Sequence, residues 1–180
     1  LKFGIKHRYP RIPLPVKLKG VVQLVRPFTL IPSFIAGCVG VILPLAYSGS
    51  WHLFANLKYV LLAAISLSLA QGFGQAYNQV TGWREDMINK KWRPIPSGIL
   101  TEDEGLLVSF ALMGCSLFLA TLIPNFIYWV AVFILMALLY NTDVKYTNCW
   151  LALIWLALSR GFLPVIATWT VYGDINSTIP

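Results

Sequence analysis

The sequence predicts an all-α membrane protein, a bundle of about five helices that cross the bilayer. Hydrophobic residues make up 57% of the 180 positions and charged residues only 12%, a balance that suits a chain whose main solvent is lipid. Apolar stretches close to the roughly 20 residues that one crossing requires recur along the chain. The expected spans are Leu30–Tyr47, Leu57–Tyr77, Leu106–Ile123, Phe126–Tyr140 and Trp150–Tyr172.

The residues before the first span form a basic, Pro-punctuated arm over 1–29. The arm has no apolar stretch followed by a small-residue cleavage site, so no secretory signal is predicted. The membrane domain is expected over 30–173, with a polar loop at 78–104, and 174–180 is expected to be a truncated tail. Because the sequence starts with Leu1 and stops soon after an apolar span, we expect a fragment of a longer protein.

Positive charge predicts that the arm and the polar loop lie on the cytoplasmic side, or its equivalent. Seven Lys and Arg residues precede the first span, four follow the second and Lys145 follows the fourth, whereas only Lys58 falls on the other side. Five spans place all these basic clusters on one face. The net charge of +7 is then explained by a face that meets anionic lipid headgroups, so no nucleic-acid partner is expected.

The polar loop closes with the start signal of the next helix. Thr101 is followed three residues later by Glu104, the capping-box pattern in which each side chain binds the other residue's backbone N–H. The third span is therefore expected to begin its helix at this point.

A stripe of polar residues continues from the end of the second span. Gln71, Gln75, Asn78, Gly82 and Asp86 recur every three or four positions, and they share one face if the helix runs on. Amides are costly in hydrocarbon unless they face a partner helix or a wet cavity. Interhelical hydrogen bonding and a cavity both explain the stripe, and the sequence leaves both open.

Carboxylates and cations meet at the end of this stripe. Glu85 and Asp86 are followed closely by Lys90, Lys91 and Arg93. Carboxylate oxygens hold Mg²⁺, the metal bridges phosphate oxygens, and Lys and Arg neutralise the remaining charge, so the pattern fits a diphosphate. The alternative is a solvated loop in which these charges pair with one another.

The run NQVTGWREDMINKKWRPIPSG at 78–98 resembles the first aspartate-rich motif of the UbiA superfamily of intramembrane prenyltransferases. The family pattern is Asn-x-x-x-Asp-x-x-x-Asp followed by Asn-(Lys/Arg)-x-x-Arg-Pro-Ile-Pro-Ser-Gly, and it aligns here without a gap. Upstream, Arg26-Pro27-Phe28-Thr29 is similar to the Arg-Pro-x-Thr that opens the family's first helix. Downstream, Tyr140 and Lys145 stand where the family carries a Tyr and Lys pair.

The resemblance implies an enzyme that transfers an isoprenyl group from a prenyl diphosphate to a lipophilic acceptor, expected to be aromatic. Mg²⁺ is the implied cofactor, with Asn78, Glu85 and Asp86 as its ligands and as the catalytic residues. Diphosphate binding is expected from Arg26, Lys90, Arg93, Lys145 and Arg160. The cavity is expected to be lined by Gln71, Gln75 and Tyr140.

Arg160 enters this set for a physical reason as well. It lies near the middle of the fifth span, where a charge needs a buried partner or a wet cavity. Arg160-Gly161 also resembles an Arg-Gly pair in the same helix of homogentisate-type family members. A structural ion pair or a contact with a backbone carbonyl group is the alternative.

Two departures from the family pattern leave other functions open. The first Asp of the triplet is Gly82 here, and Glu85 is the nearest substitute carboxylate. The superfamily has about nine helices with a second aspartate-rich motif, so five spans correspond to half of that fold. A terpene cyclase of the same fold and a non-catalytic subunit of a larger membrane complex are the alternatives to a prenyltransferase.

Overall fold

The computed structural model describes residues 12–47 and 53–159, and none of these residues forms a strand. The helices near the N-terminus are α1 (Leu14–Val25), the 3-10 turn η1 (Pro27–Leu30) and α2 (Ile31–Tyr47). The middle of the chain forms α3 (Leu53–Thr81), α4 (Trp83–Asn89) and α5 (Glu102–Ala120). The last described elements are α6 (Phe126–Leu139), the π-helix η2 (Tyr140–Val144), α7 (Lys145–Thr147) and α8 (Cys149–Ala157).

Among the described residues, four helical segments are long and apolar enough to cross a membrane: Leu14–Tyr47, Leu57–Thr81, Glu102–Ala120 and Phe126–Thr147. They contain α2, α3, α5 and α6, which correspond to the first four predicted spans. The fifth predicted span begins with α8, and the rest of it, including Arg160, lies outside the described residues. The helical membrane fold predicted from the sequence is confirmed.

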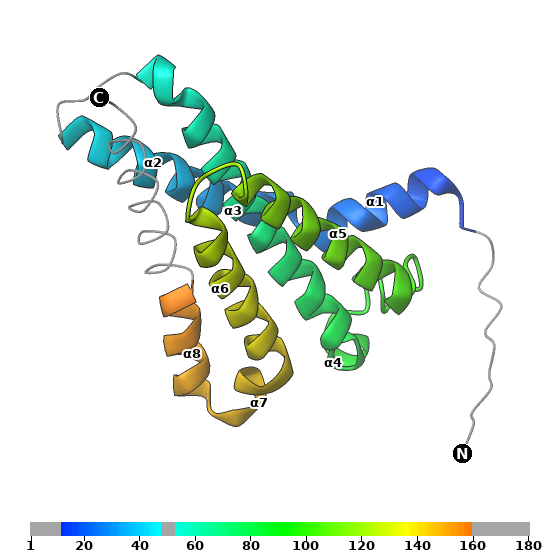
Figure 1. Cartoon of the computed structure of the whole chain (residues 1–180). Helices are drawn as coiled ribbons and strands as arrows, with labels where there is room; N and C mark the ends of the chain where they lie inside the picture. Colours follow the sequence, from blue (N-terminus) through cyan, green and yellow to red (C-terminus); the bar gives the residue numbers. More distant parts are fainter. Residues whose placement is uncertain (1–11, 48–52, 160–180) are drawn as a thin grey trace.

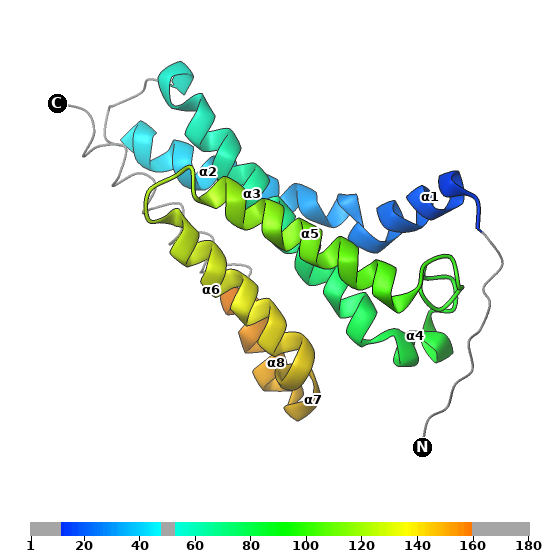
Figure 2. The same cartoon turned by 45° about the vertical axis from the view of Figure 1, so that its right-hand side comes forward.

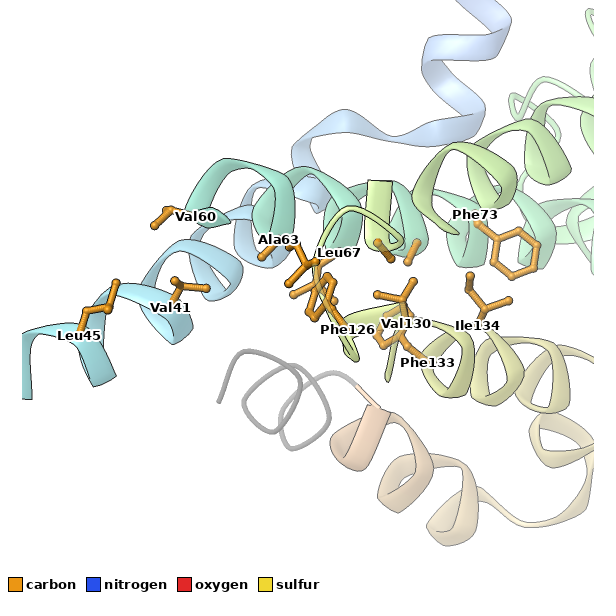
Figure 3. Close-up of a cluster of buried hydrophobic side chains, with 13 residues drawn as sticks. Val41, Leu45, Val60, Ala63, Leu67, Phe73, Phe126, Val130, Phe133 and Ile134 are labelled. Atoms are coloured by element: carbon orange, nitrogen blue, oxygen red, sulfur yellow. The ribbon is translucent and has the colours of Figure 1, made fainter. Parts of the chain in front are cut away.

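The helix α3 is the centre of the bundle. At about 1.5 Å per residue its 29 residues extend about 43 Å, more than the roughly 30 Å of a hydrocarbon core, so at least one of its ends projects beyond the apolar layer. It packs mainly against α5 and α2, and also against α6 (Figure 1). Figure 3 shows the side chains that fill these contacts, among them Val41, Leu67, Phe126 and Phe133.

Small residues allow the central helices to approach closely. An ideal Cβ at Gly37 of α2 would lie 2.6 Å from the Cα of Ala64 on α3, so the two backbones are in direct contact. Between α3 and α5, Ser66 and Ser116 are fully buried, and each hydroxyl donates to the other residue's carbonyl oxygen, at 3.0 and 2.8 Å. Lipid offers these hydroxyls no partner, so the reciprocal pair fixes the register of the two helices.

The polar loop predicted at 78–104 is partly helical. The helix α3 continues to Thr81, and α4 follows directly after Gly82, because polar residues at a membrane surface do not end a helix. The predicted capping box is present: the Glu104 N–H donates to Thr101 Oγ1 at 3.1 Å, and the Thr101 N–H donates to Glu104 Oε2 at 3.0 Å. It starts α5 where the sequence indicated.

The helix α1 lies within the predicted basic arm, where the sequence analysis identified no helix. Lys17 of α1 forms an ion pair with Glu104 at the start of α5, and Gln79 Nε2 donates to the Leu24 carbonyl oxygen at 2.6 Å. Lys145 forms an ion pair with Glu85 of α4. Figures 1 and 2 show α4 and α7 at the same end of the bundle. The described part of the arm, the motif segment and the connection after α6 therefore share one end.

The contact of α2 with α3 makes Gly37 sensitive to any side chain. Gly37→Ala is expected to lower the free energy of unfolding by about 1–3 kcal/mol, because the new methyl group meets backbone atoms that cannot move aside. Gly114 of α5 is the matched control, since an ideal Cβ there meets nothing within 4 Å, and Gly114→Ala is expected to leave stability unchanged or to raise it by up to about 1 kcal/mol, the helix-propensity gain of Ala over Gly. Unfolding of both variants in detergent measures the difference, and equal effects would contradict the described helix packing.

Candidate functional site

A cavity of about 540 Å³ lies between η1, the start of α2, the second half of α3 and the segment after α4; we call it the central cavity. Leu67, Gln71, Gln75 and Asn78 line it from successive turns of α3. Its apolar part also includes Ala36, Pro32 and Phe133, whereas its other end is formed by Arg26, Lys90 and Arg93. The cavity is therefore apolar at one end, amide-lined in the middle and cationic at the end of the bundle.

Arg26 reaches the cavity from an unusual backbone position. It caps α1 with a φ of 54°, in the left-handed region, which costs a non-glycine residue roughly 1 kcal/mol or more. The turn is held by Thr29, whose Oγ1 donates to the Arg26 carbonyl oxygen at 2.8 Å and whose N–H donates to the same oxygen at the same distance. The strained turn ends α1 and begins η1, which places Arg26 beside the amide stripe.

Arg93 is positioned by Asp86. Asp86 is buried, with 9% of its side chain exposed, and its Oδ2 accepts a charge-assisted hydrogen bond from Arg93 Nη1. A buried carboxylate needs such a partner, because an unpaired charge in this environment would be strongly destabilising. Arg93 lines the central cavity, whereas Asp86 is not among the described residues that line it. Asp86 therefore acts on the cavity by holding the Arg93 side chain in position.

Glu85 is engaged by a residue that is distant in sequence. Its Oε2 accepts a hydrogen bond of 3.1 Å from Lys145 Nζ, and this hydrogen bond lowers the pKa of the Glu85 carboxyl from its ordinary value. Gly82 leaves room for the contact: an ideal Cβ at position 82 would lie 3.1 Å from Lys145 Nζ. The lysine ammonium thus occupies the space beside residue 82 where the family pattern has a carboxylate.

A second set of polar atoms lies on the other side of the amide stripe. Asn78 and Asn141 each have a buried Oδ1 atom without a hydrogen-bond partner in the described structure. Both line a smaller pocket of about 40 Å³ together with Tyr140, which begins the π-helix. Helices of this type occur often at functional sites. Sequence analysis missed Asn141, and its only signal was a polar amide next to Tyr140 at the end of an apolar span.

The donor set fits a hard cation that arrives together with a phosphate ligand. Asn78 Oδ1 is a free acceptor, and Asp86 and Glu85 add carboxylate oxygens, the ligand type that Mg²⁺ prefers. Both carboxylates are already paired with cations, and the described residues contain no group of three His, Cys, Asp or Glu that could hold a metal. Mg²⁺ is often held by one or two carboxylates plus substrate phosphates, so the lack of a three-residue group does not by itself disagree with the predicted cofactor.

The structure places the sequence-predicted residues in three groups. Arg26, Lys90, Arg93, Gln71, Gln75 and Asn78 line the central cavity. Tyr140 lies in the small pocket that shares Asn78 with that cavity, and the pairs of Glu85 with Lys145 and Asp86 with Arg93 lie at the end of the bundle. Arg160 is outside the described residues.

Comparisons with known proteins agree on one family. A model of the UbiA prenyltransferase family matches residues 30–180. Digeranylgeranylglyceryl phosphate synthase of Saccharolobus solfataricus is 32% identical over 134 residues, covering 74% of this chain and 45% of that protein. The enzyme of the same name from Natronomonas pharaonis is 29% identical over 136 residues, covering 71% and 44%. The chain thus spans under half the length of these curated relatives.

A solved structure has the same fold. It comes from a study of digeranylgeranylglyceryl phosphate synthase in membranes, and it matches with a TM-score of 0.66 at 22% identity. The match covers 87% of this chain and 60% of that one. At this identity the likeness shows the fold alone.

The ion pair of Glu85 with Lys145 predicts a pH dependence of stability. Because the pKa of Glu85 is lowered in the folded protein, the pair stabilises the fold at neutral pH, and this contribution is lost as the pH falls through the lowered pKa. Glu85→Gln is expected to remove the contribution. The carboxylate is half-exposed, so the loss near neutral pH is at most about 1 kcal/mol. Thermal unfolding at about pH 7 and about pH 3 measures it.

Gly82 supplies the control for this prediction. An Asp side chain at position 82 would meet the Lys145 ammonium, so adding Gly82→Asp to Glu85→Gln is expected to restore the stability near neutral pH. Adding Gly82→Asn instead introduces no negative charge, so it is expected not to restore the stability near neutral pH. The same unfolding temperature for Glu85→Gln and the unsubstituted protein at both pH values would contradict the described contact.

Proposed function

This integral membrane chain belongs to the UbiA prenyltransferase family, and from that premise we propose that the whole protein transfers an isoprenyl group from a prenyl diphosphate to a lipophilic acceptor. The main support for the proposal is the lining of the central cavity: Arg26, Lys90 and Arg93 form one end, and apolar residues form the other. The family membership and the names of the relatives support the transferase class.

The cationic end suits the diphosphate. Arg93 is paired with Asp86, whereas neither Arg26 nor Lys90 forms a salt bridge with any residue that the structure describes. Charges facing a partly enclosed cavity interact more strongly than charges in bulk water, so two cations that are in no salt bridge favour an anionic ligand there. Charge-assisted hydrogen bonds from guanidinium and ammonium groups are strong, and guanidinium also gives bidentate geometry to phosphate oxygens.

The apolar end suits the isoprenyl chain. Leu67 of α3 and Phe133 of α6 line the cavity at the depth of the membrane core, next to Ala36 of α2. A volume of about 540 Å³ is in the range of pockets that bind small ligands. A prenyl diphosphate would therefore lie with its head at the polar end of the bundle and its tail between α2, α3 and α6.

The chemistry follows from charge stabilisation. The bond between the allylic carbon and the diphosphate oxygen breaks, the oxygen keeps the electron pair, and Arg26, Lys90 and Arg93 stabilise the leaving diphosphate. The acceptor nucleophile then forms a bond to the allylic carbon and loses its proton. Mg²⁺, when bound with the diphosphate, adds positive charge to the leaving group, and Asn78, Asp86 and Glu85 are the residues that would hold it.

We further propose that the basic end of the bundle faces the cytoplasm or its equivalent, because cytoplasmic loops are enriched in Lys and Arg. Prenyl diphosphates are water-soluble at the head, so a site at this face is open to a ligand arriving from the aqueous side. The loss of an aspartate at Gly82 is compatible with this proposal, because the cations at the cavity do not depend on it.

The test is release of diphosphate by the full-length protein in lipid nanodiscs, supplied with geranylgeranyl diphosphate and a lipid extract. Arg26→Gln is expected to lower kcat/KM about 30-fold or more, because it removes one cation from the leaving group. Asp86→Asn is expected to lower it at least about 100-fold, since it removes a carboxylate oxygen and leaves Arg93 unpaired. Lys58→Gln, which removes a cation at the other end of α3, is the matched control and is expected to change little.

The outcomes separate the alternatives. Release that requires an added acceptor supports a prenyltransferase, whereas release without any acceptor, with a cyclic product, would show a terpene cyclase. No release by the unsubstituted protein in any lipid would show a non-catalytic subunit and overturn the proposal.

A further inference from the structure

The pocket of about 40 Å³ between α3, η2 and α8 opens a second question; we call it the small pocket. Gln71, Gln75 and Asn78 of α3 line both this pocket and the central cavity. On the far side, Trp155 Nε1 of α8 donates to the Met136 carbonyl oxygen of α6 at 2.9 Å, which holds α8 beside α6 (Figure 2). The small pocket is therefore a side chamber of the central cavity.

Two buried carbonyl oxygens without a partner line the small pocket. Asn141 is 3% exposed, and its Nδ2 donates to the Ala137 carbonyl oxygen at 2.7 Å, so its Oδ1 is the side-chain atom left for another partner. The Oδ1 of Asn78 is also buried and has no partner among the described residues. A buried acceptor that has lost water and gained no hydrogen bond is destabilising. Each oxygen therefore requires a hydrogen-bond donor.

The π-helix η2 brings Asn141 to the pocket. Neighbouring side chains of an α-helix point about 100° apart. A π-helix closes its hydrogen bonds over one more residue, which reduces that angle, and the consecutive residues Tyr140 and Asn141 both line the pocket. The irregular turn at the end of α6 thus supplies the pocket with its second amide oxygen.

The lining selects the chemical class of the ligand. Two carbonyl oxygens accept hydrogen bonds, so a diphosphate, whose oxygens also accept, does not fit between them. A cation would need a counter-charge, and the two carboxylates of α4, Glu85 and Asp86, are paired with Lys145 and Arg93. The volume has room for about one or two water molecules and for no ring or lipid chain. The ligand that fits is a small neutral donor, which is water.

We propose that the small pocket binds one water molecule, which donates one hydrogen bond to Asn78 Oδ1 and the other to Asn141 Oδ1. Asn141 is then a positioning residue, because it holds the Asn78 side chain through this water. The positioning role rests on the proposed function, in which Asn78 acts at the diphosphate end of the central cavity.

Asn78 needs such a partner to keep one orientation. Among the described residues, none forms a hydrogen bond with its side chain. An amide group carries an acceptor and a donor, and a half-turn of the group exchanges them. A water bound to Oδ1 opposes this exchange, and because an amide oxygen has two lone pairs, the second one stays free for a ligand in the central cavity. A side chain that is already held in place loses less freedom when the ligand binds, so affinity is higher.

The test is binding of inorganic pyrophosphate to the full-length protein in detergent with Mg²⁺ present. Asn141→Leu, which has a similar size and no acceptor, is expected to weaken pyrophosphate about tenfold, because Asn78 loses its water. In the Asn78→Ala background the same substitution is expected to change the affinity less than about twofold, since Asn141 acts only through Asn78. Equal weakening in both backgrounds would show a merely structural role and would overturn the inference.

A conservative substitution tests whether the water bridge itself matters. The hydroxyl in Asn141→Ser can donate to the carbonyl oxygen four residues earlier, as Ser68 does to Ala64 at 2.7 Å, and still accept from water. Pyrophosphate affinity is expected to stay within about threefold of that of the unsubstituted protein. An affinity as weak as that of Asn141→Leu would contradict the bridge.

Thr142 supplies the matched control, because its hydroxyl belongs to the same π-helix and donates to the Leu138 carbonyl oxygen at 3.2 Å, but Thr142 does not line the small pocket in the described structure. Thr142→Val is expected to leave pyrophosphate affinity within about twofold. The same loss in Thr142→Val as in Asn141→Leu would assign the effect to the π-helix and overturn the inference.

An experimental structure of the unsubstituted full-length protein tests the site independently of pyrophosphate. Density for one water within about 3.2 Å of both Oδ1 atoms is expected. A direct hydrogen bond between the two amides, a side chain that fills the pocket, or a metal ion in place of the water would overturn the inference alone. If the unsubstituted protein does not bind pyrophosphate, the proposed function and the positioning role both fail, and the density still decides whether water occupies the pocket.

Discussion

The absence of hydrogen-bond partners in lipid is the constraint on which this structure depends. Each polar group within the bundle has to meet another polar group or face a wet cavity. Ser66 and Ser116 satisfy the constraint by bonding to each other's backbone, and they thereby hold α3 against α5. Gln71 and Gln75 satisfy it by facing the central cavity. The need for polar partners in lipid therefore determines both how α3 and α5 pack and where the cavity lies.

The same rule sorts the charges at the end of the bundle. The most deeply buried carboxylate there, Asp86, is paired with Arg93, and the more exposed Glu85 is paired with Lys145. Arg26 forms no salt bridge with any residue that the structure describes, although its backbone is held in a strained turn beside the central cavity. A protein gains no stability from such an arrangement by itself. An anionic ligand would account for the arrangement, and under the proposed function this ligand is the diphosphate of the prenyl donor.

Properties that depend on neighbouring residues could be predicted from the sequence, and those that depend on distant ones could not. Hydropathy identified the four described spans, and the spacing of Thr101 and Glu104 identified the start of α5. The pairing of Glu85 with Lys145 joins residues 60 positions apart, and no local pattern encodes it. The left-handed turn at Arg26 was also missed, because a motif gives residue types and not backbone angles. A cavity of about 590 Å³ is lined by Val22 and Gln23 of α1 together with Trp92 after α4, and residues so far apart in the sequence carry no local signal of this contact.

The most direct test of this account is an experimental structure of the full-length protein with a non-reactive thiodiphosphate analogue of geranylgeranyl diphosphate. The account predicts diphosphate density within hydrogen-bond distance of Arg26 and Lys90, with the isoprenyl chain passing Leu67 and Phe133 between α2, α3 and α6. A diphosphate bound away from these cations, or a central cavity filled by side chains in the presence of saturating analogue, would contradict it.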